Sequence, residues 1–297
     1  MNRHTSRRRF LQNSALLGGT LAFGLPYAWA DRVKSSSPAA EKLGWRIGLA
    51  QYTFRRFSFF ETLDLAVKLG ISCIEPDFFL PLDKARPKLL INEDLSPELR
   101  KEVKQRLADR GLTMASFYAN LGADAERAKK IFEFSKEMGA KAIVAEPPVA
   151  AFDMIEKLCD EHDIDLAIHN HPKPSSAYWN PDAVVAACKG RGKHIGACCD
   201  TGHWVRSGLD TVECLKKLEG RIRGFHLKDV IASGKPEARD VPLGEGKGNY
   251  RAILAELKRQ GYRGVLGIEY EHDSPQLMED VAKCVAFVEQ TAKKLEG

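Results

Sequence analysis

Eight short apolar runs alternate with eight longer amphipathic stretches between residues 46 and 295, and this alternation restricts the fold more than any other feature. The short runs have the length of β-strands, whereas the longer stretches repeat apolar residues at helical spacing. Glycine follows four of the helical stretches, at Gly70, Gly111, Gly139 and Gly261, where a left-handed residue commonly ends a helix. Eight strand–helix pairs in about 250 residues predict one α/β domain, a single (β/α)8 TIM barrel.

A doubly wound open sheet is the rival arrangement, but no Gly-x-Gly-x-x-Gly turn follows the first expected strand. The expected strands cover 46–51, 73–75, 113–118, 142–146, 166–169, 195–200, 224–226 and 265–269. The expected helices cover 59–69, 97–110, 125–138, 153–162, 181–189, 210–218, 250–260 and 275–295.

The first thirty residues carry a pattern of their own. Arg7 and Arg8 precede an apolar run over 15–28 that two glycines interrupt, and Ala28-Trp29-Ala30 offers the small residues of a cleavage site. This predicts a twin-arginine signal peptide over 1–30, a linker over 31–43 and the barrel over 44–297. The expected partner is the twin-arginine export machinery, and the expected location is periplasmic or otherwise exported. The run is too short for a stable membrane anchor, although an uncut basic anchor is the alternative.

Composition and charge exclude several classes of protein. The chain is 44% hydrophobic and 29% charged, which is typical of a globular domain. Its formal charge is +5, but the first thirty residues hold four arginines and no acid, so the remainder has 41 basic against 40 acidic residues. A near-neutral domain lacks the positive field that nucleic-acid binding needs, so we expect no nucleic-acid partner.

The last five expected strands end in side chains that bind metals through nitrogen or carboxylate oxygen: Glu146, His169, Asp200, His226 and Glu269. In a (β/α)8 barrel the active site lies at these carboxyl ends of the strands. A mixed imidazole and carboxylate set suits a divalent Mn, Mg, Co or Zn ion. Strand-end caps or a core histidine are the structural alternatives for Asp200, Glu269 and His226.

Four segments resemble the xylose isomerase-like TIM barrel superfamily, the sugar phosphate isomerase/epimerase family: Cys199–His203, Phe225–Asp229, Pro242–Gly246 and Gly267–Glu269. The resemblance extends over residues 44 to 292. In tagatose 3-epimerase-like members the metal is held by Glu, Asp, His and Glu after strands five to eight. Asp200, His226 and Glu269 match the last three, and His169 stands where those members have the first glutamate.

The resemblance implies a divalent-metal-dependent sugar isomerase or epimerase that abstracts a proton next to a sugar carbonyl through a metal-bound enediolate. It implies His169, Asp200, His226 and Glu269 as metal ligands, and His169 and Glu269 as catalytic groups. Glu146, which ends the fourth expected strand, is a further expected catalytic group. In those members two glutamates lie on opposite sides of the substrate carbon and exchange its proton. A histidine in place of one glutamate favours reactions in which the proton moves on one side only. Such reactions are isomerisation, or a lyase or hydratase reaction on a 3-keto-glycoside or keto-sugar. Glu146 is the alternative to His169 for completing the metal shell.

Five side chains near these strand ends are expected to bind a neutral sugar: Tyr118, His171, Trp179, His203 and Lys228. Aromatic faces with a few polar groups suit sugar rings, and the resemblance implies that His203 contacts substrate hydroxyls. Lys228 shares a strand face with His226 and could balance an anionic intermediate. Only His169, and not His171, should face the mouth directly if that strand continues. Core packing, or a surface position for Lys228, is the alternative role.

Two other functions compete with the sugar enzyme. A non-catalytic sugar-binding barrel would keep the fold without turnover, but the intact Asp200, His226 and Glu269 oppose it. An abasic-site endonuclease shares the barrel and an Asp-Thr-x-His element, but near-neutral charge and expected export oppose it. The sequence leaves the oligomeric state open, a homo-oligomer included.

Overall fold

The computed structural model describes residues 37–296. The expected signal peptide over 1–30 and the first part of the expected linker lie outside these described residues. Within them, no helix has both the length and the apolar composition needed to cross a membrane.

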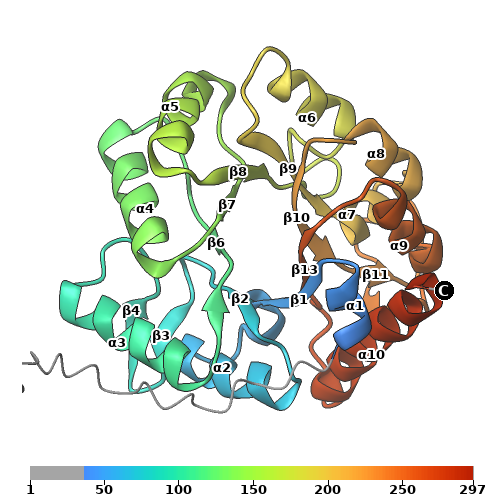
Figure 1. Cartoon of the computed structure of the whole chain (residues 1–297), viewed down its shortest axis with the longest axis horizontal. Helices are drawn as coiled ribbons and strands as arrows, with labels where there is room; N and C mark the ends of the chain where they lie inside the picture. Colours follow the sequence, from blue (N-terminus) through green and yellow to red (C-terminus); the bar gives the residue numbers. More distant parts are fainter. Residues whose placement is uncertain (1–36, 297) are drawn as a thin grey trace, which may run out of the picture.

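Parallel strands form a ring that helices surround, and this confirms the (β/α)8 TIM barrel (Figure 1). The sheet runs in the order β5-β2-β1-β13-β10-β9-β8-β7-β6. β5 and β6 are separated by Ala115 alone, and its N–H donates to Ile74 while its carbonyl accepts from Lys141. The two therefore act as one barrel strand, which closes the ring at eight strand positions. The strands are β1 (Trp45–Ala50), β2 (Cys73–Glu75), β5 (Thr113–Met114), β6 (Ser116–Tyr118), β7 (Ala142–Ala145), β8 (Asp165–Ile168), β9 (Ile195–Asp200), β10 (Ile222–Leu227) and β13 (Gly264–Ile268).

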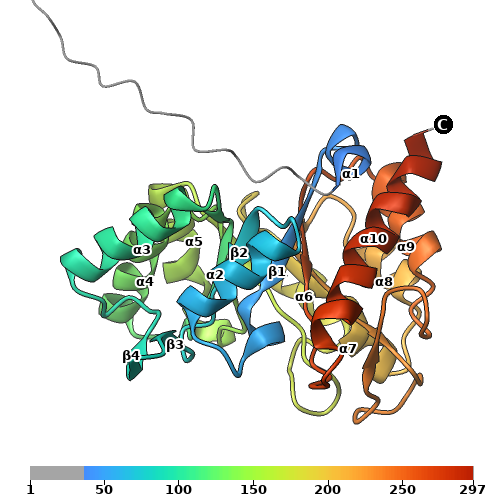
Figure 2. The same ribbon diagram turned by 90° about the horizontal axis from the view of Figure 1, so that it is seen from below.

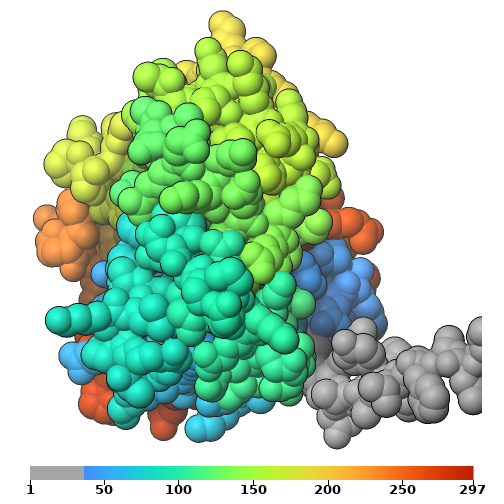
Figure 3. Space-filling model, turned by 90° about the vertical axis from the view of Figure 1, so that its left-hand side faces the viewer, coloured from blue at the N-terminus to red at the C-terminus, as the bar shows by residue number. Residues whose placement is uncertain are grey.

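Each strand is followed by a helix that packs its apolar side against the barrel. These helices are α2 (Phe59–Lys68), α3 (Pro97–Asp109), α4 (Ala125–Met138), α5 (Phe152–His162), α6 (Pro181–Cys188), α8 (Thr211–Lys217), α9 (Tyr250–Arg259) and α10 (Leu277–Glu296). Local chemistry fixes their ends: Ser58 and Glu61 form a capping box at the start of α2, and Gly139 takes φ of 86° after α4. Figure 3 shows α3, α4 and α5 covering one outer side of the barrel.

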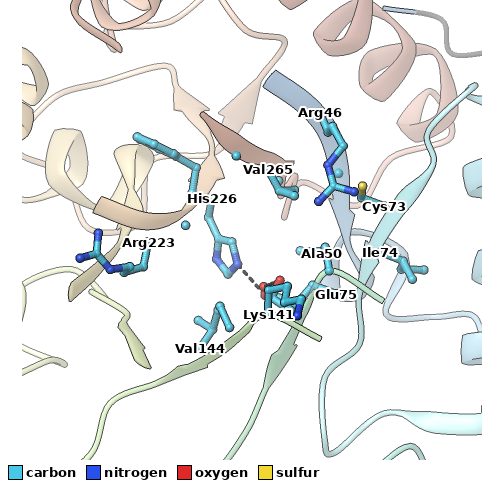
Figure 4. Close-up of a pocket in the computed structure, with 18 of the residues that line it drawn as sticks. Arg46, Ala50, Cys73, Ile74, Glu75, Lys141, Val144, Arg223, His226 and Val265 are labelled. Carbon is cyan, nitrogen blue, oxygen red and sulfur yellow. Dashed lines mark hydrogen bonds and ion pairs between the residues drawn. The ribbon is translucent and has the colours of Figure 1, made fainter. Parts of the chain in front are cut away.

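The inside of the barrel is unusual because small residues line its middle. Gly48, Cys73, Ala142, Gly224 and Gly267 surround a cavity of about 190 Å³. In barrels of this class the interior is ordinarily filled by layers of large branched side chains. The cavity reaches from Arg46 and Lys141, near the start of their strands, up to Glu75 and His226 (Figure 4). Polar groups at both ends and this volume make it suitable for buried water.

Several short elements lie outside the eight pairs. η1 (Gln51–Phe54) and η2 (Val149–Ala151) are 3-10 turns, and α7 (Thr201–Arg206) is a short helix that directly follows β9. Two hairpins, β3 (Pro81–Asp83) with β4 (Arg86–Leu90) and β11 (Asp229–Val230) with β12 (Asp240–Val241), extend the loops after β2 and β10.

The sequence predicts a linker up to residue 43, but its described part contains helix α1 (Pro38–Lys42). Proline at the first helical position favours a helix start, and Ala39 and Ala40 are buried. Their N–H groups donate to Glu289 of α10 at 3.0–3.1 Å. The ordered barrel therefore includes α1, which lies beside the end of α10 (Figure 2).

Candidate active site

The structure brings together the four predicted metal ligands at the carboxyl ends of β8, β9, β10 and β13. One donor atom of each of His169, Asp200, His226 and Glu269 lies within 4.8 Å of the others, and all four side chains are buried. His226 Nδ1 is 3.1 Å from His169 Nε2, 3.1 Å from Glu269 Oε2 and 3.9 Å from Asp200 Oδ2. His169 Nε2 is 3.7 Å from Asp200 Oδ2.

The four separations of 3.1 to 3.9 Å between these donor atoms fit a shared divalent ion. Two donors that are each about 2.1 Å from one ion lie at most about 4.2 Å apart. Asp200 divides its oxygens between two tasks: Oδ1 accepts from the His203 N–H at 2.8 Å and caps α7, whereas the buried Oδ2 faces the cluster, 3.1 Å from Lys228 Nζ and 3.7 Å from His169 Nε2. A buried carboxylate oxygen of this kind is a natural ligand for a cation, and the nitrogen and oxygen donors suit Zn, Mn, Co or Mg.

Both histidines are oriented by a carboxylate on the nitrogen that faces away from the cluster. His226 Nε2 contacts Glu75 Oε1 at 2.7 Å, the contact that Figure 4 marks, and Glu75 in turn accepts from Ser116. His169 Nδ1 contacts Glu146 Oε1 at 3.3 Å. Histidines that bind metals almost always have such a partner, which fixes the ring and its tautomer.

Lys228 is the buried cation of the site. Its Nζ lies 3.1 Å from Asp200 Oδ2, 2.8 Å from Glu269 Oε2 and 3.1 Å from Glu271 Oε1, and its side chain is 0% exposed. The surface position considered for this lysine is therefore wrong. Burial lowers the pKa of Lys228, but the facing carboxylates raise it well above its ordinary value, so the ammonium stays charged.

The carboxylates of the site stay ionised for the reciprocal reason. Burial raises the pKa of Glu269, but the positive charges of Lys228 and His226 outweigh this effect. The pKa of Glu269 therefore lies well below its ordinary value. Burial likewise opposes ionisation of Asp200, while His203 and Lys228 hold its pKa well below the usual range. At neutral pH the site thus holds charged carboxylates beside a charged ammonium.

A second group of charged residues, on α7, on β12 and after β13, supports Lys228. Arg206 contacts Asp240 Oδ1 at 2.6 Å and Glu271 Oε2 at 2.5 Å, and its Nη1 donates to His203 Nδ1 at 3.1 Å. His203 is buried, and burial lowers its pKa well below the ordinary value. Its Nε2 lies 3.3 Å from Lys228 Nζ, so the structure places His203 at the edge of the cluster.

Glu146 lies behind His169. Its Oε1 contacts His169 and His171, and its Oε2 accepts from Ser176 at 2.6 Å. Burial raises the pKa of Glu146, but the two histidine contacts lower it to about 2. His171 turns toward the same carboxylate as His169 because β8 ends at Ile168, so strand alternation does not separate the two rings. His171 therefore also faces the site.

Glu146→Gln is expected to lower turnover and metal affinity by about tenfold to a hundredfold, because His169 loses the charged group that orients it. The ionised Glu146 stabilises the fold fully above pH 4.5, its ordinary pKa, and this contribution disappears as the pH falls toward about 2. Urea unfolding at pH 7 and pH 3 should show a smaller pH dependence for the variant. Glu161→Gln, at an exposed position, is the control; equal metal affinity in both variants would contradict the role.

The mouth of the site is a cavity of about 430 Å³ above the cluster. Tyr118 and His171 both line it. Trp179 lies elsewhere among the described residues: its ring packs under Lys173 at 5.1 Å on the loop after β8. The residues lining the cavity are Tyr52, Asp77, Phe78, Phe79, Tyr118, His169, His171, Glu269 and Glu271.

Sequence reasoning missed Glu75, Glu271, Arg206 and Asp240 as supports of the site. Glu75 carries the same signal as the predicted ligands, since it ends β2. Glu271 lies two residues after Glu269, a spacing that keeps side chains on one side of an extended chain. Arg206 and Asp240 lie on α7 and β12, elements that the local pattern did not predict.

Comparison with known proteins gives a family match over most of the barrel. A model of the family described as "Xylose isomerase-like TIM barrel" matches residues 63–289. The rhizopine catabolism protein MocC of Rhizobium meliloti is 29% identical over 138 residues, which are 42% of this chain and 42% of MocC. The match thus spans less than half the length of MocC. The inosose dehydratase of Geobacillus thermodenitrificans is 26% identical over 226 residues, 60% of this chain and 75% of that enzyme.

Solved structures agree on the fold. An uncharacterized protein from Parabacteroides distasonis superposes with a TM-score of 0.66 at 33% identity, covering 83% of this chain and 99% of that one. The IolI protein, solved with a bound zinc atom, superposes with a TM-score of 0.62 at 19% identity, covering 84% of this chain and 95% of IolI. At 19% identity, the likeness to IolI concerns the fold alone.

Proposed function

The chain belongs to the family of xylose isomerase-like TIM barrels, and we propose that it is a divalent-metal-dependent enzyme that removes a proton next to the carbonyl of a keto-sugar. One observation carries the proposal. Glu269 is a buried, ionised carboxylate that lines the mouth cavity and contacts Lys228 and His226 at 2.8 and 3.1 Å. Both contacts use Oε2, so the other oxygen is not needed to hold the side chain and can accept a proton.

The residues divide the work of proton abstraction. A divalent cation held by His169, Asp200, His226 and Glu269 would polarise the oxygens of a hydroxyketone. Glu269 takes the proton from the carbon beside the carbonyl, and the resulting negative charge develops on the carbonyl oxygen. The Lys228 ammonium, which is buried and lies 2.8 Å from Glu269 Oε2, would stabilise that charge. Glu75 and Glu146 keep the two imidazoles in place.

We propose loss of a β-oxygen substituent as the outcome, a dehydratase or lyase reaction in which the substituent leaves as water or an alcohol with the proton that Glu269 accepted. The two-carboxylate relay that the resemblance implies for epimerases would need a second carboxylate where this chain has His169, an imidazole tied to Glu146 at 3.3 Å. The inosose dehydratases among the curated relatives support elimination. Isomerisation shares the first step and is the second candidate, because Glu269 could return the proton to the adjacent carbon.

Deuterium exchange tests the shared first step. The purified protein is incubated in D₂O with an inosose, a 3-keto-glucoside and a ketohexose, after loading with Mn, Co, Zn or Mg in turn. We expect deuterium at the carbon next to the carbonyl of one of them, followed by an unsaturated product if elimination occurs. Proton NMR reads both events. If no sugar takes up deuterium with any metal, the proposal is overturned and a non-catalytic sugar-binding barrel becomes the better account.

Replacing His169 tests the outcome. His169→Glu restores a carboxylate pair, but the new side chain would lie beside Glu146, so the double variant with Glu146→Gln is the one to assay. We expect it to remain folded and to add deuterium on the second face, which gives an epimerised product that the parent does not make. Circular dichroism and product NMR measure these effects. A folded double variant with unchanged metal content and unchanged product would contradict the assignment of His169.

A further inference from the structure

The mouth cavity has two chemically different halves. The charged half comes from residues that follow β8 and β13, whereas the other half is aromatic and comes from η1 and the loop after β2. Tyr52 and Phe79 have ring centroids 6.0 Å apart, and Phe78 and Phe79 have centroids 5.1 Å apart, each pair edge to face. Phe79 is 41% exposed. An exposed phenylalanine at the rim of a polar site offers a flat apolar surface that water covers poorly.

Asp77 lies within this aromatic half and lacks part of its hydrogen bonding. Its side chain lines the cavity, it is 4% exposed, and Oδ2 has no hydrogen-bond partner in the described part of the chain. Its own N–H donates to Gln51 Oε1 at 3.3 Å, which ties the loop after β2 to η1. Burial, with Glu269 and Glu75 nearby, raises the pKa of Asp77 well above its ordinary value. A buried carboxyl oxygen without a partner costs stability unless a ligand group satisfies it.

We propose that Tyr52, Asp77, Phe78 and Phe79 form a second sugar subsite, so that the substrate is a glycoside whose reacting ring occupies the charged half. Only the placement of the reacting ring in the charged half rests on the proposed function. A pyranose ring presents C–H groups on one face, which pack on aromatic rings, and hydroxyls at its edge, which would satisfy Asp77. The cavity of about 430 Å³ lies within the roughly 300–1,000 Å³ range of pockets that bury a drug-sized ligand.

A planar aromatic aglycone is the other group that an aromatic wall could hold. Asp77 favours the sugar, because a planar hydrocarbon ring would leave Oδ2 buried against apolar atoms without a partner.

Binding of unreactive sugars tests the subsite without relying on turnover. Isothermal titration calorimetry is carried out with glucose, cellobiose and 4-nitrophenyl β-glucoside, using the purified protein with its retained metal. We expect cellobiose to bind about tenfold more tightly than glucose. Phe79→Ala should remove most of this advantage and leave glucose affinity within about twofold. Asp77→Asn, which preserves size, should weaken cellobiose binding by a similar factor.

Phe57→Ala is the matched control, since Phe57 is 40% exposed and lines a different cavity. It should change neither affinity. The subsite is overturned if cellobiose binds no more tightly than glucose, or if Phe79→Ala and Phe57→Ala behave alike. Tighter binding of the nitrophenyl glucoside than of cellobiose would assign the wall to an aglycone and overturn the sugar assignment. Cellobiose binding as expected, with no deuterium exchange in any keto-sugar, would leave the subsite standing and reject the proposed reaction.

Discussion

Glu269→Gln is expected to lower turnover by about three orders of magnitude while the barrel stays folded. The substitution preserves the size of the side chain but removes the carboxylate that would accept the proton, and general-base catalysis contributes about a hundredfold to ten-thousandfold. It also removes one anionic donor from the cluster of four, so metal affinity should fall as well. Lys228 keeps its contacts with Asp200 and Glu271, which limits the loss of stability.

Turnover is measured on the sugar that exchanges deuterium, metal content by elemental analysis, and folding by circular dichroism. Glu237→Gln, at an exposed position in the loop between β11 and β12, should retain full activity and separates a local effect from a general one. Turnover within tenfold of the parent in a folded Glu269→Gln protein would rule out Glu269 as the base.

Lys228→Met should cost about 3–5 kcal/mol of folding free energy, because it leaves the carboxylates of Asp200, Glu269 and Glu271 without their buried cation. Added Mn²⁺ or Zn²⁺ should restore part of this stability, since a bound cation replaces the missing charge and binding to the folded state stabilises it. Urea unfolding with and without metal measures both effects.

The pH dependence of this variant should have the opposite sign to that of the parent. In the parent the pKa values of Asp200 and Glu269 are depressed, so their contribution is present above about pH 4 and disappears as the pH falls. Without Lys228, burial dominates and raises these pKa values, so stability should increase as the pH falls from 7 toward 5. Lys247→Met, an exposed lysine in the loop after β10, is the control. A Lys228→Met protein as stable as this control would contradict the account.

The sequence predicts the eight strand–helix pairs because each depends on a local pattern of about ten residues. It misses α1, whose stability comes from Glu289 of α10, 249–250 residues away. It also misses the β3–β4 and β11–β12 hairpins, since their short strands follow no long hydrophobic period. These elements depend on contacts made after the barrel closes.

In the candidate site, too, the residues at strand ends could be predicted from the sequence, whereas their long-range contacts could not. The strand-end rule identifies His169, Asp200, His226 and Glu269 because parallel strands bring their carboxyl ends to one face. The partner of each histidine could not be predicted, because the pairing of Glu75 with His226 joins residues 151 positions apart in the chain. The expectation that His171 points away from the mouth assumed that the strand continues past His169. It was wrong because β8 ends at Ile168.

The packing of α1 against α10 brings the two ends of the described chain side by side. Lys42 Nζ lies 3.1 Å from Glu296 Oε2, on the face where β1 begins rather than where the strands end in the candidate site. A short linker could therefore join these ends covalently without crossing the mouth, and new termini could be opened at the exposed turn 84–85. Such a circular permutation would begin the chain at β4, between β2 and α3 of the second strand–helix pair, and return the same barrel. The natural order of the strand–helix pairs in the sequence is thus one of several orders that are compatible with this barrel.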